Sequence, residues 1–155
     1  MEIITAELVN VMNQPEGLTP EFDALWDATL QKLEQHQEEI LEKCSLPIKK
    51  FIKEINLFNC PIHSRSINFF TDEYPLVVGQ PQEKVYSLSY EVIDRPKIIY
   101  HDGAGFDKNE KACWLYDEFH RVENHYIHNV LFSDGMEMQI PFVFFYFRQQ
   151  SWFEE

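Results

Sequence analysis

The chain has 155 residues, of which 45% are apolar and 15% aromatic, and it carries a formal net charge of −13. This length and composition suit one domain with a sizeable hydrophobic core and argue against an intrinsically disordered chain. The negative charge argues against nucleic acid and anionic membranes as direct partners, because both require positive charge to displace counterions.

Cysteine usage and the lack of long apolar runs bear on the compartment. Cys44, Cys60 and Cys113 are widely spaced without a CxxC pair, and the start of the chain, MEIITAELVNVM, lacks the basic region of a signal peptide. We therefore expect free thiols in the reducing cytoplasm. No apolar run reaches the ~18 residues of a membrane span, so we expect no membrane association.

Residues 1–58 carry helical patterns, beginning with a short helix at TAELVNVM. Thr19 is a good N-cap and Pro20 suits a first helical position. We therefore expect a long helix over residues 20–44 and a second amphipathic helix to about residue 57. The apolar residues of the long helix share one face: Phe22, Leu25, Trp26, Leu30, Leu33, Ile40 and Cys44.

The long predicted helix also carries a stripe of acidic residues beside its apolar face. Its members fall within an arc of roughly 100°; they are Asp23, Asp27, Glu34, Glu38 and Glu42. Like charges four residues apart oppose a helix by ~0.2–0.5 kcal/mol per pair. In this helix only Glu39 and Lys43 form a favourable pair at that spacing. The stripe is either a solvated face or a docking surface for a basic partner protein.

Residues 64–150 have the pattern of β-strands. Segments such as SINFF, KVYSLSYEVI, CWLYDEFHRV and HYIHNVLF are rich in β-branched and aromatic residues, with turn-forming residues between them. Consecutive strands with short turns predict an antiparallel sheet. The expected fold class is α+β: two or three N-terminal helices packed on one face of an antiparallel sheet of about five to seven strands. We expect residues 1–155 to form a single domain, because two helices cannot bury their apolar face alone.

The turn Ser133-Asp134-Gly135 predicts one strand register. If all three residues form the loop and Gly135 is left-handed, Phe132 faces Met136. The same register places Tyr126, His128 and Val130 beside Phe142, Ile140 and Met138. It gathers more apolar side chains on one face than a two-residue turn would, so we prefer it.

Residues 142–147, FVFFYF, form a strongly aromatic strand. Strict alternation would place Phe142, Phe144 and Tyr146 on one face, and Val143, Phe145 and Phe147 on the other. Such a strand is either central and buried on both faces or, if Val143, Phe145 and Phe147 are exposed, an interface for a homo-oligomer.

The stretch HRVENHYIH, residues 120–128, holds three histidines, His120, His125 and His128. His125 and His128 are three residues apart, so in an extended strand they point to opposite faces, and His120 belongs to the preceding strand. Three converging ligands are hard to arrange in this geometry. We therefore predict ordinary strand histidines and no metal site, unless His120 meets one of the others beside a carboxylate.

A small enzyme or small-molecule-binding domain is the alternative function. Its pocket, near residues 101–107 and 118–128, would combine His101 and Asp102 with Glu118 and His120. Alternation puts Glu118 and His120 on one face of a strand, and a carboxylate beside an imidazole is the minimum for acid–base catalysis. The glycines of HDGAGFD permit an anion-binding nest, but no nucleophile, P-loop or HExxH motif is present.

The leading hypothesis is a non-enzymatic, cytoplasmic protein-interaction domain whose acidic helix binds a basic partner protein. It assigns no catalytic residue and expects no cofactor. By analogy of size and charge alone, such a chain suits a neutralising partner of the toxin-immunity or antitoxin kind.

Overall fold

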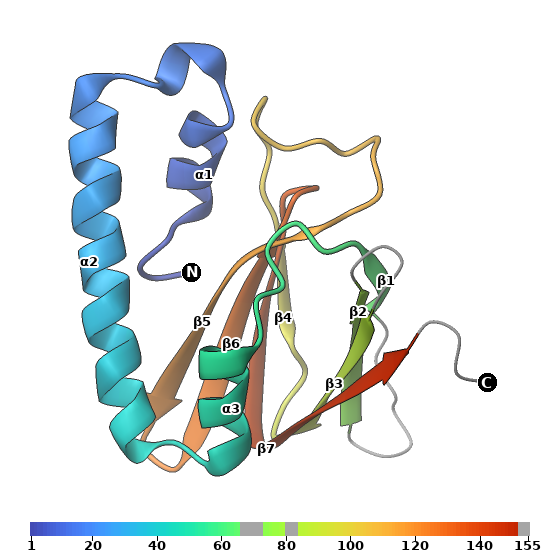
Figure 1. Ribbon diagram of the computed structural model, residues 1–155. Helices are drawn as coiled ribbons and strands as arrows, with labels where there is room; N and C mark the ends of the chain where they lie inside the picture. Colours follow the sequence, from blue (N-terminus) through green and yellow to red (C-terminus); the bar gives the residue numbers. More distant parts are fainter. Residues whose placement is uncertain (66–72, 80–83, 152–155) are drawn as a thin grey trace.

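The computed structural model describes residues 1–65, 73–79 and 84–151. Three α-helices come first, α1 (Ala6–Met12), α2 (Pro20–Lys43) and α3 (Leu46–Glu54), with a 3₁₀ turn at Pro15–Gly17. Seven described strands follow: β1 (Ile62–Arg65), β2 (Glu73–Gly79), β3 (Lys84–Val92), β4 (Lys97–Tyr100), β5 (Trp114–Val122), β6 (His125–Phe132) and β7 (Met136–Ser151) (Figure 1). The expected strand at SINFF, residues 66–70, lies outside the described residues.

The strands form one antiparallel sheet in the order β1-β2-β3-β7-β6-β5, and β4 also pairs with β7. The long strand β7 organises this sheet, because one of its edges pairs with β6 and the other pairs with both β3 and β4. The predicted α+β class, with N-terminal helices before an antiparallel sheet, is confirmed. No helix in the described part of the chain is long and apolar enough to cross a membrane.

The helix starts follow the local signals in the sequence. The side-chain oxygen of Thr19 accepts a hydrogen bond from the backbone N–H of Phe22 at 3.1 Å, and Pro20 is the first residue of α2. Thr5 caps α1 in the same way, through the N–H of Leu8. The predicted helix boundaries are thus confirmed to within a few residues.

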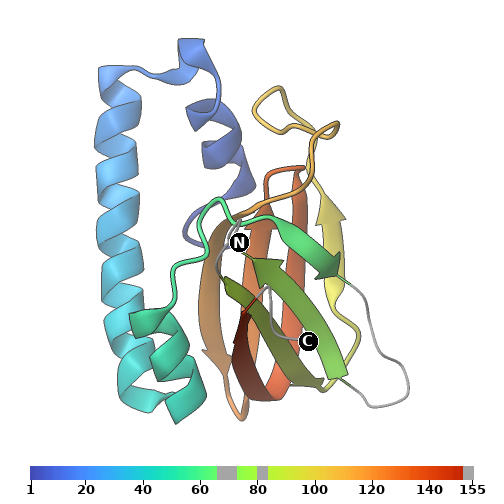
Figure 2. The ribbon, with the colours of Figure 1, turned by 45° about the vertical axis from the view of Figure 1, so that its right-hand side comes forward.

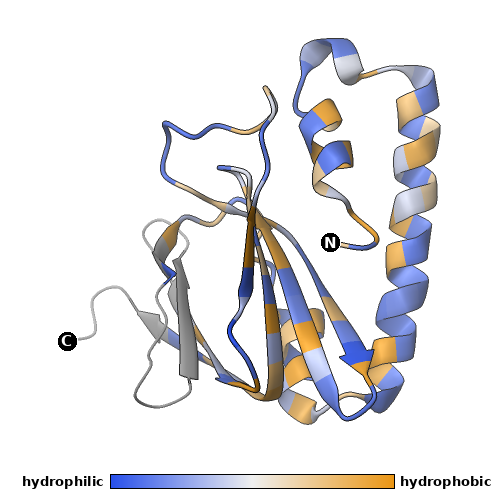
Figure 3. Cartoon of the chain, turned by 180° about the vertical axis from the view of Figure 1, so that it is seen from behind, coloured by the Kyte–Doolittle hydropathy of each residue, from blue (hydrophilic) through white to orange (hydrophobic). Residues whose placement is uncertain are grey.

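The helices are distributed around the sheet. Ile48 and Phe51 of α3 are buried in a core with β3, β5, β6 and β7. Ile4 and Val9, from the N-terminal segment and α1, are buried in a second cluster with Leu131. Since Leu131 alternates with core residues of β6, this second cluster lies on the opposite sheet face. Figure 3, seen from behind, shows α1 and the N-terminus on the near side and α3 beyond the strands.

Helix α2 runs alongside the edge strand β5, and its lower end meets α3 (Figure 2). A helix at a sheet edge buries only a narrow arc, and in α2 the buried residues are Phe22, Thr29 and Ile40. Two residues that we expected on the apolar face, Leu25 and Leu30, are 51% and 41% exposed. That part of the helical prediction is wrong, because it assumed a helix lying flat on the sheet.

Strict alternation along residues 142–147 is also wrong. The pairing with β3 shifts between Glu91, opposite Phe144, and Val92, opposite Phe142, so β7 carries one extra residue at this point. As a result Phe142 and Phe145 are both buried on the same side, whereas Phe144 and Tyr146 are 54% and 56% exposed. The exposed aromatic pair of this strand is therefore Phe144 and Tyr146.

The predicted hairpin register between β6 and β7 is confirmed. Tyr126, His128 and Val130 pair with Phe142, Ile140 and Met138. Gly135 has a φ of +88°, and its N–H donates to the carbonyl of Phe132 at 3.0 Å. The three-residue loop places His128 on the side of the sheet that faces α3.

Candidate functional site

A small cavity lies where α2, α3 and the edge strand β5 meet. Its volume is about 100 Å³. Apolar residues are the majority of those that line it, but most of its accessible surface is polar, because polar groups enter it from α2 and β5. The lining residues are Leu33, His36, Gln37, Ile40, Phe51, Ile52, Ile55, Asp117, Glu118 and Phe119.

A chain of hydrogen bonds runs from this cavity into the core. Nε2 of His128 lies 2.8 Å from Oδ2 of Asp117, and Nδ1 of His128 lies 2.6 Å from the hydroxyl of Tyr90. His128 and Tyr90 are fully buried, whereas the Asp117 side chain is 27% exposed. A neutral imidazole satisfies both contacts, with Nε2–H donating to the carboxylate and Nδ1 accepting from the phenol.

Burial decides the protonation state of His128. Removal from water lowers the pKa of its imidazole more than the hydrogen bond and charge of Asp117 raise it. The ring stacks on Phe119 with centroids 3.8 Å apart and 8° between planes, and Phe51 and Trp114 contact it as well. His128 is therefore a neutral core residue that holds Asp117 at the cavity wall.

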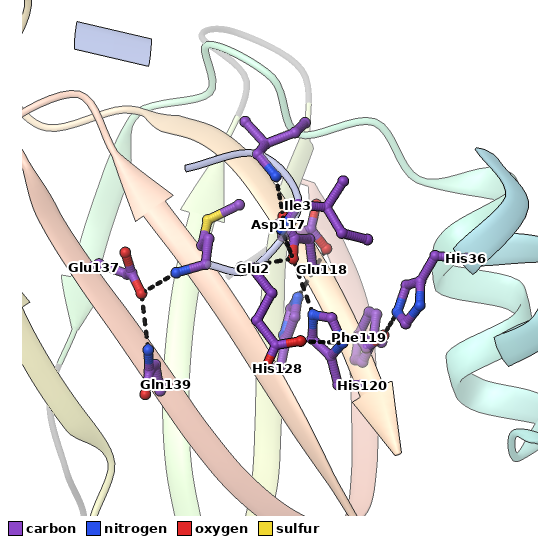
Figure 4. A network of polar contacts seen from close by, with 12 residues as sticks. Glu2, Ile3, His36, Asp117, Glu118, Phe119, His120, His128, Glu137 and Gln139 are labelled. Atoms are coloured by element: carbon purple, nitrogen blue, oxygen red, sulfur yellow. Dashed lines mark hydrogen bonds and ion pairs between the residues drawn. The ribbon is translucent and has the colours of Figure 1, made fainter. Parts of the chain in front are cut away.

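The other face of the sheet carries a second polar network around Glu118 (Figure 4). This carboxylate is 2% exposed and accepts hydrogen bonds from the backbone N–H of Ile3 and, at 2.6 Å, of Ile4. His120 contacts it through Nε2 at 2.9 Å. Burial alone would raise the pKa of Glu118, but these hydrogen bonds outweigh it and hold the pKa below its usual value.

Glu137 is the second buried carboxylate on this face. It pairs with the amino group of Met1, accepts from the Gln139 amide at 2.9 Å and lies 3.0 Å from Nε2 of His101. Burial would raise the pKa of this carboxyl, and its hydrogen-bonding partners together lower it. Glu118 and Glu137 thus hold the first residues of the chain against the sheet (Figure 4).

His36 connects α2 to the edge strand. Its Nε2 lies 2.6 Å from the carbonyl oxygen of Phe119, so this nitrogen carries the proton and donates. The His36 and His120 rings are 4.4 Å apart, and Nδ1 of His120 lies 3.4 Å from the Glu2 carboxylate. His36 therefore covers an edge carbonyl that would otherwise be open to another strand.

The three clustered histidines do not converge. His128 is buried on the α3 side with both nitrogens bonded, whereas His120 contacts Glu118 on the opposite face. Among the residues that the structure describes, no three His, Cys, Asp or Glu side chains are arranged to hold a metal ion.

The residues of the alternative pocket are only partly brought together. Glu118 and His120 touch, but His101 contacts Glu137, and Asp102 is 92% exposed and pairs with Lys108. The loop at 101–107 packs on α1, where the N–H of Gly105 donates to Oδ1 of Asn10 at 2.7 Å.

The glycines of this loop have a packing role. A Cβ atom on Gly103 would lie 2.2 Å from the Asn10 side chain, and one on Gly105 would lie 2.2 Å from the Asn10 carbonyl oxygen. Close approach to α1 therefore accounts for both glycines, and one of the N–H groups that a nest would need is already engaged.

The acidic stripe of α2 is exposed along its whole length, at Asp23, Asp27, Glu34, Glu38 and Glu42. None of these carboxylates makes a hydrogen bond or ion pair within residues 1–65, 73–79 and 84–151. Figure 3 shows hydrophilic residues over much of this helix. The stripe is therefore open to solvent and to any partner.

Sequence reasoning did not single out Tyr90 or His36 as site residues. It considered Asp117 with Glu118 and His120 but left it out of the predicted pocket. A signal for Asp117 was present, since a two-residue turn at Glu123-Asn124 makes Phe119 face His128 and puts Asp117 diagonal to it. Tyr90 and His36 come from distant segments, and no local pattern relates them to β5.

Comparison of the chain with models of known protein families and with curated proteins gives no match.

Proposed function

We propose that this chain is a non-enzymatic interaction domain and that the acidic face of α2 binds a basic partner protein. The observation that carries the proposal is the stripe itself: five exposed carboxylates on one helix, none with an internal partner among the described residues. Charge arranged in this way speeds the encounter with a partner of opposite sign and selects against acidic ones.

The position of α2 supports this role. The helix stands at a sheet edge with three buried residues in its 24, so most of its surface is available to a partner. Leu30, 41% exposed, lies about 20° around the helix from Asp23 and adds apolar area beside the acids. An interface of this kind combines charge steering with some hydrophobic burial.

The enzyme alternative finds less support in the geometry. The polar groups that would serve as acid and base are already engaged: Glu118 accepts from backbone N–H groups, and the ring nitrogens of His120 contact the carboxylates of Glu118 and Glu2. An active site needs such groups directed at a substrate. Their present partners favour structural roles.

We place the domain in the cytoplasm and assign it no nucleic-acid partner. Cys44 and Cys113 carry free thiols, which suits a reducing compartment. The net charge of −13 opposes binding to phosphate backbones.

The test is a charge reversal with a matched control. The stripe variant is Glu34→Lys, Glu38→Lys and Glu42→Lys together. The control reverses three exposed acids outside the stripe, Glu7, Glu16 and Glu110, and so changes the net charge equally. Tagged proteins expressed in the native host are purified at low salt, and bound proteins are quantified by mass spectrometry.

A basic protein that is retained by wild type and control at fixed stoichiometry, and lost by the stripe variant, is the expected result. Equal retention by all three proteins would show that the stripe is not the docking surface. A metal or small molecule bound to the native chain in native mass spectrometry would favour the alternative function instead.

Self-association through residues 142–147 is a second candidate, supported by the exposure of Phe144 and Tyr146 on one uncovered part of the sheet. Exposed aromatic neighbours are typical of interfaces. Native mass spectrometry at micromolar concentration should then show a dimer for the wild-type protein. The double variant Phe144→Thr, Tyr146→Thr should be a monomer. A wild-type monomer at every concentration would contradict it.

A further inference from the structure

The cavity between α2, α3 and β5 has the size of a single side chain. Its volume of about 100 Å³ is well below the ~300–1,000 Å³ of pockets for cofactors and drug-sized ligands. At ~30 Å³ per water molecule it is the space of about three waters. Leu33, Gln37, Ile52 and Ile55 on its wall are only half-buried, so the cavity opens to the surface.

One carboxylate gives the cavity its chemical preference. Oδ2 of Asp117 is held by His128, and no described residue donates to its Oδ1. Because His128 is neutral, it brings no positive charge to Asp117, and no described Lys or Arg side chain pairs with this carboxylate. A half-buried anion beside apolar side chains favours a cation that brings its own apolar stem.

The aromatic wall narrows the class of ligand further. Phe51 and Phe119 line the same cavity as Asp117, and His128 covers one face of the Phe119 ring. The two phenylalanines offer apolar contact to the stem of a ligand. A lysine side chain offers a compact ammonium on a flexible four-carbon stem, which a single available oxygen can accept. Arginine needs a paired arrangement of acceptors to use its planar fork, and Asp117 has only one oxygen that His128 does not already engage.

One residue of the acidic stripe, Glu34, lies beside this cavity. Gln37, a lining residue, is three positions after Glu34 and so lies about 60° around α2 from it. Figure 2 shows α3 beside the lower end of α2, next to β5. The residues that line the cavity come from these three elements. A basic chain that binds at Glu34 would therefore lie close to the cavity mouth.

We propose that this cavity receives a lysine side chain of the basic partner protein, with its ammonium paired to Asp117 and its methylene groups against Phe51 and Phe119. The inference rests on the proposed function, because it assumes a basic chain lying along the stripe. It adds a specificity determinant to a surface that would otherwise recognise charge alone.

The experiment uses two synthetic peptides in place of the unknown partner. The first is acetyl-Arg-Ala-Lys-Ala-Arg-amide, and in the second norleucine, which lacks the ammonium, replaces the lysine. Affinities for the wild-type protein are measured by NMR titration at low salt. We expect the lysine peptide to bind about tenfold or more tightly than the norleucine peptide, with saturable shifts at Ile40, Ile52 and Phe119.

The key variant is Asp117→Asn. An asparagine oxygen can still accept from Nε2 of His128, while its amide nitrogen would face the ammonium. The ratio of the affinity for the lysine peptide to that for the norleucine peptide, here called the lysine preference, should therefore fall to about one. Should this variant fail to fold, Ile55→Phe fills the cavity instead, and Ile93→Phe, at a residue 50% exposed elsewhere, is its control.

The stripe variant separates this inference from the proposed function. Reversing Glu34, Glu38 and Glu42 should weaken both peptides equally through their arginines and leave the lysine preference intact. A wild-type preference near one, or a preference that survives both Asp117→Asn and Ile55→Phe, would overturn the cavity inference whatever the stripe does. Unchanged affinities in the stripe variant, with the preference intact, would overturn the docking proposal alone.

Discussion

The Nε2 atom of His128 lies 2.8 Å from Oδ2 of Asp117, and this contact joins the hydrophobic core to the cavity wall. His128 is fully buried, and its other nitrogen is bonded to the hydroxyl of Tyr90. A polar residue at such a depth is tolerated only when every hydrogen-bonding group is satisfied. The same contacts that stabilise the core therefore orient Asp117.

A double-mutant cycle should measure this coupling. His128→Phe keeps the aromatic packing but removes the acceptor for the Tyr90 hydroxyl, so we expect a loss of about 1–3 kcal/mol in the free energy of unfolding. Tyr90→Phe should cost a similar amount. In the double variant, the loss of unfolding free energy should be smaller than the sum of the two single losses. The hydroxyl and its acceptor are then both absent, so neither is left buried without its partner. Urea denaturation gives the four values, and simple additivity would contradict the coupling.

The pH dependence of stability should report the same residue. Burial lowers the pKa of His128 below its usual value of about 6.5. Between the two pKa values the unfolded chain binds a proton that the folded chain does not. The stability that neutral His128 contributes is therefore fully present above about pH 6.5. It is lost as the pH falls from there through the pKa of His128 in the folded protein.

Urea denaturation between pH 7.5 and 5 would show this loss in wild type and a flatter profile in His128→Phe. Identical profiles would remove His128 as the cause.

A second loss of stability at lower pH belongs to Glu118 and Glu137, whose pKa values are lowered in the fold. Their contribution is present above about pH 4.3 and disappears as the pH falls further.

Glu118→Gln should release the N-terminal segment. A glutamine has one acceptor oxygen and an amide that would face the N–H groups of Ile3 and Ile4, so it cannot hold both. We expect faster hydrogen exchange at those two amides and a stability loss of about 1–3 kcal/mol. Glu7→Gln, at an exposed position of α1, is the control. Unchanged exchange at Ile3 and Ile4 would show that Glu118 does not hold this segment.

Local chemistry explains which parts of the fold could be predicted. The start of α2 follows from Thr19 and Pro20, and the β6–β7 register follows from the turn at Gly135, because each depends on residues a few positions apart. The extra residue in β7 opposite Glu91 and Val92 was not predictable, since it arises from pairing with a distant strand. One such residue reverses the expected faces of Phe144 and Phe145.

The candidate site shows the same division. Sequence alternation placed Glu118 and His120 on one face, and they do touch. The partners of Glu118, the N–H groups of Ile3 and Ile4, come from more than 110 positions away, and no periodic pattern relates them. The cavity likewise needs the placement of α2 beside β5, which depends on tertiary packing. Hydrophobic patterning gives the faces of elements and not their neighbours.

Gly135→Ala should test the turn that sets the register. A Cβ atom there would lie 2.4 Å from the His101 carbonyl oxygen, and the φ of +88° is unfavourable for alanine. We expect a loss of at least about 1 kcal/mol in unfolding free energy. Gly135→Asn separates the two causes, because asparagine tolerates a left-handed backbone better but has the same Cβ. An equal loss in both variants would identify the contact with His101 as the dominant cause, and no loss in either would contradict the turn geometry.

The acidic stripe should oppose the stability of its own helix. Glu38 has a like charge four residues away on each side, at Glu34 and Glu42, so Glu38→Gln removes two repulsions and should raise the unfolding free energy by about 0.4–1 kcal/mol. Glu39→Gln is the matched control on the same turn, since it removes the favourable pair with Lys43 and should lower stability slightly. Both effects should vanish in 1 M salt, where the screening length is about 3 Å. A gain from Glu38→Gln at low salt means that the native charge lowers stability, as expected of a surface kept for binding. A loss that persists in salt would mean that Glu38 supports the fold, and the stripe would then need no partner to explain it.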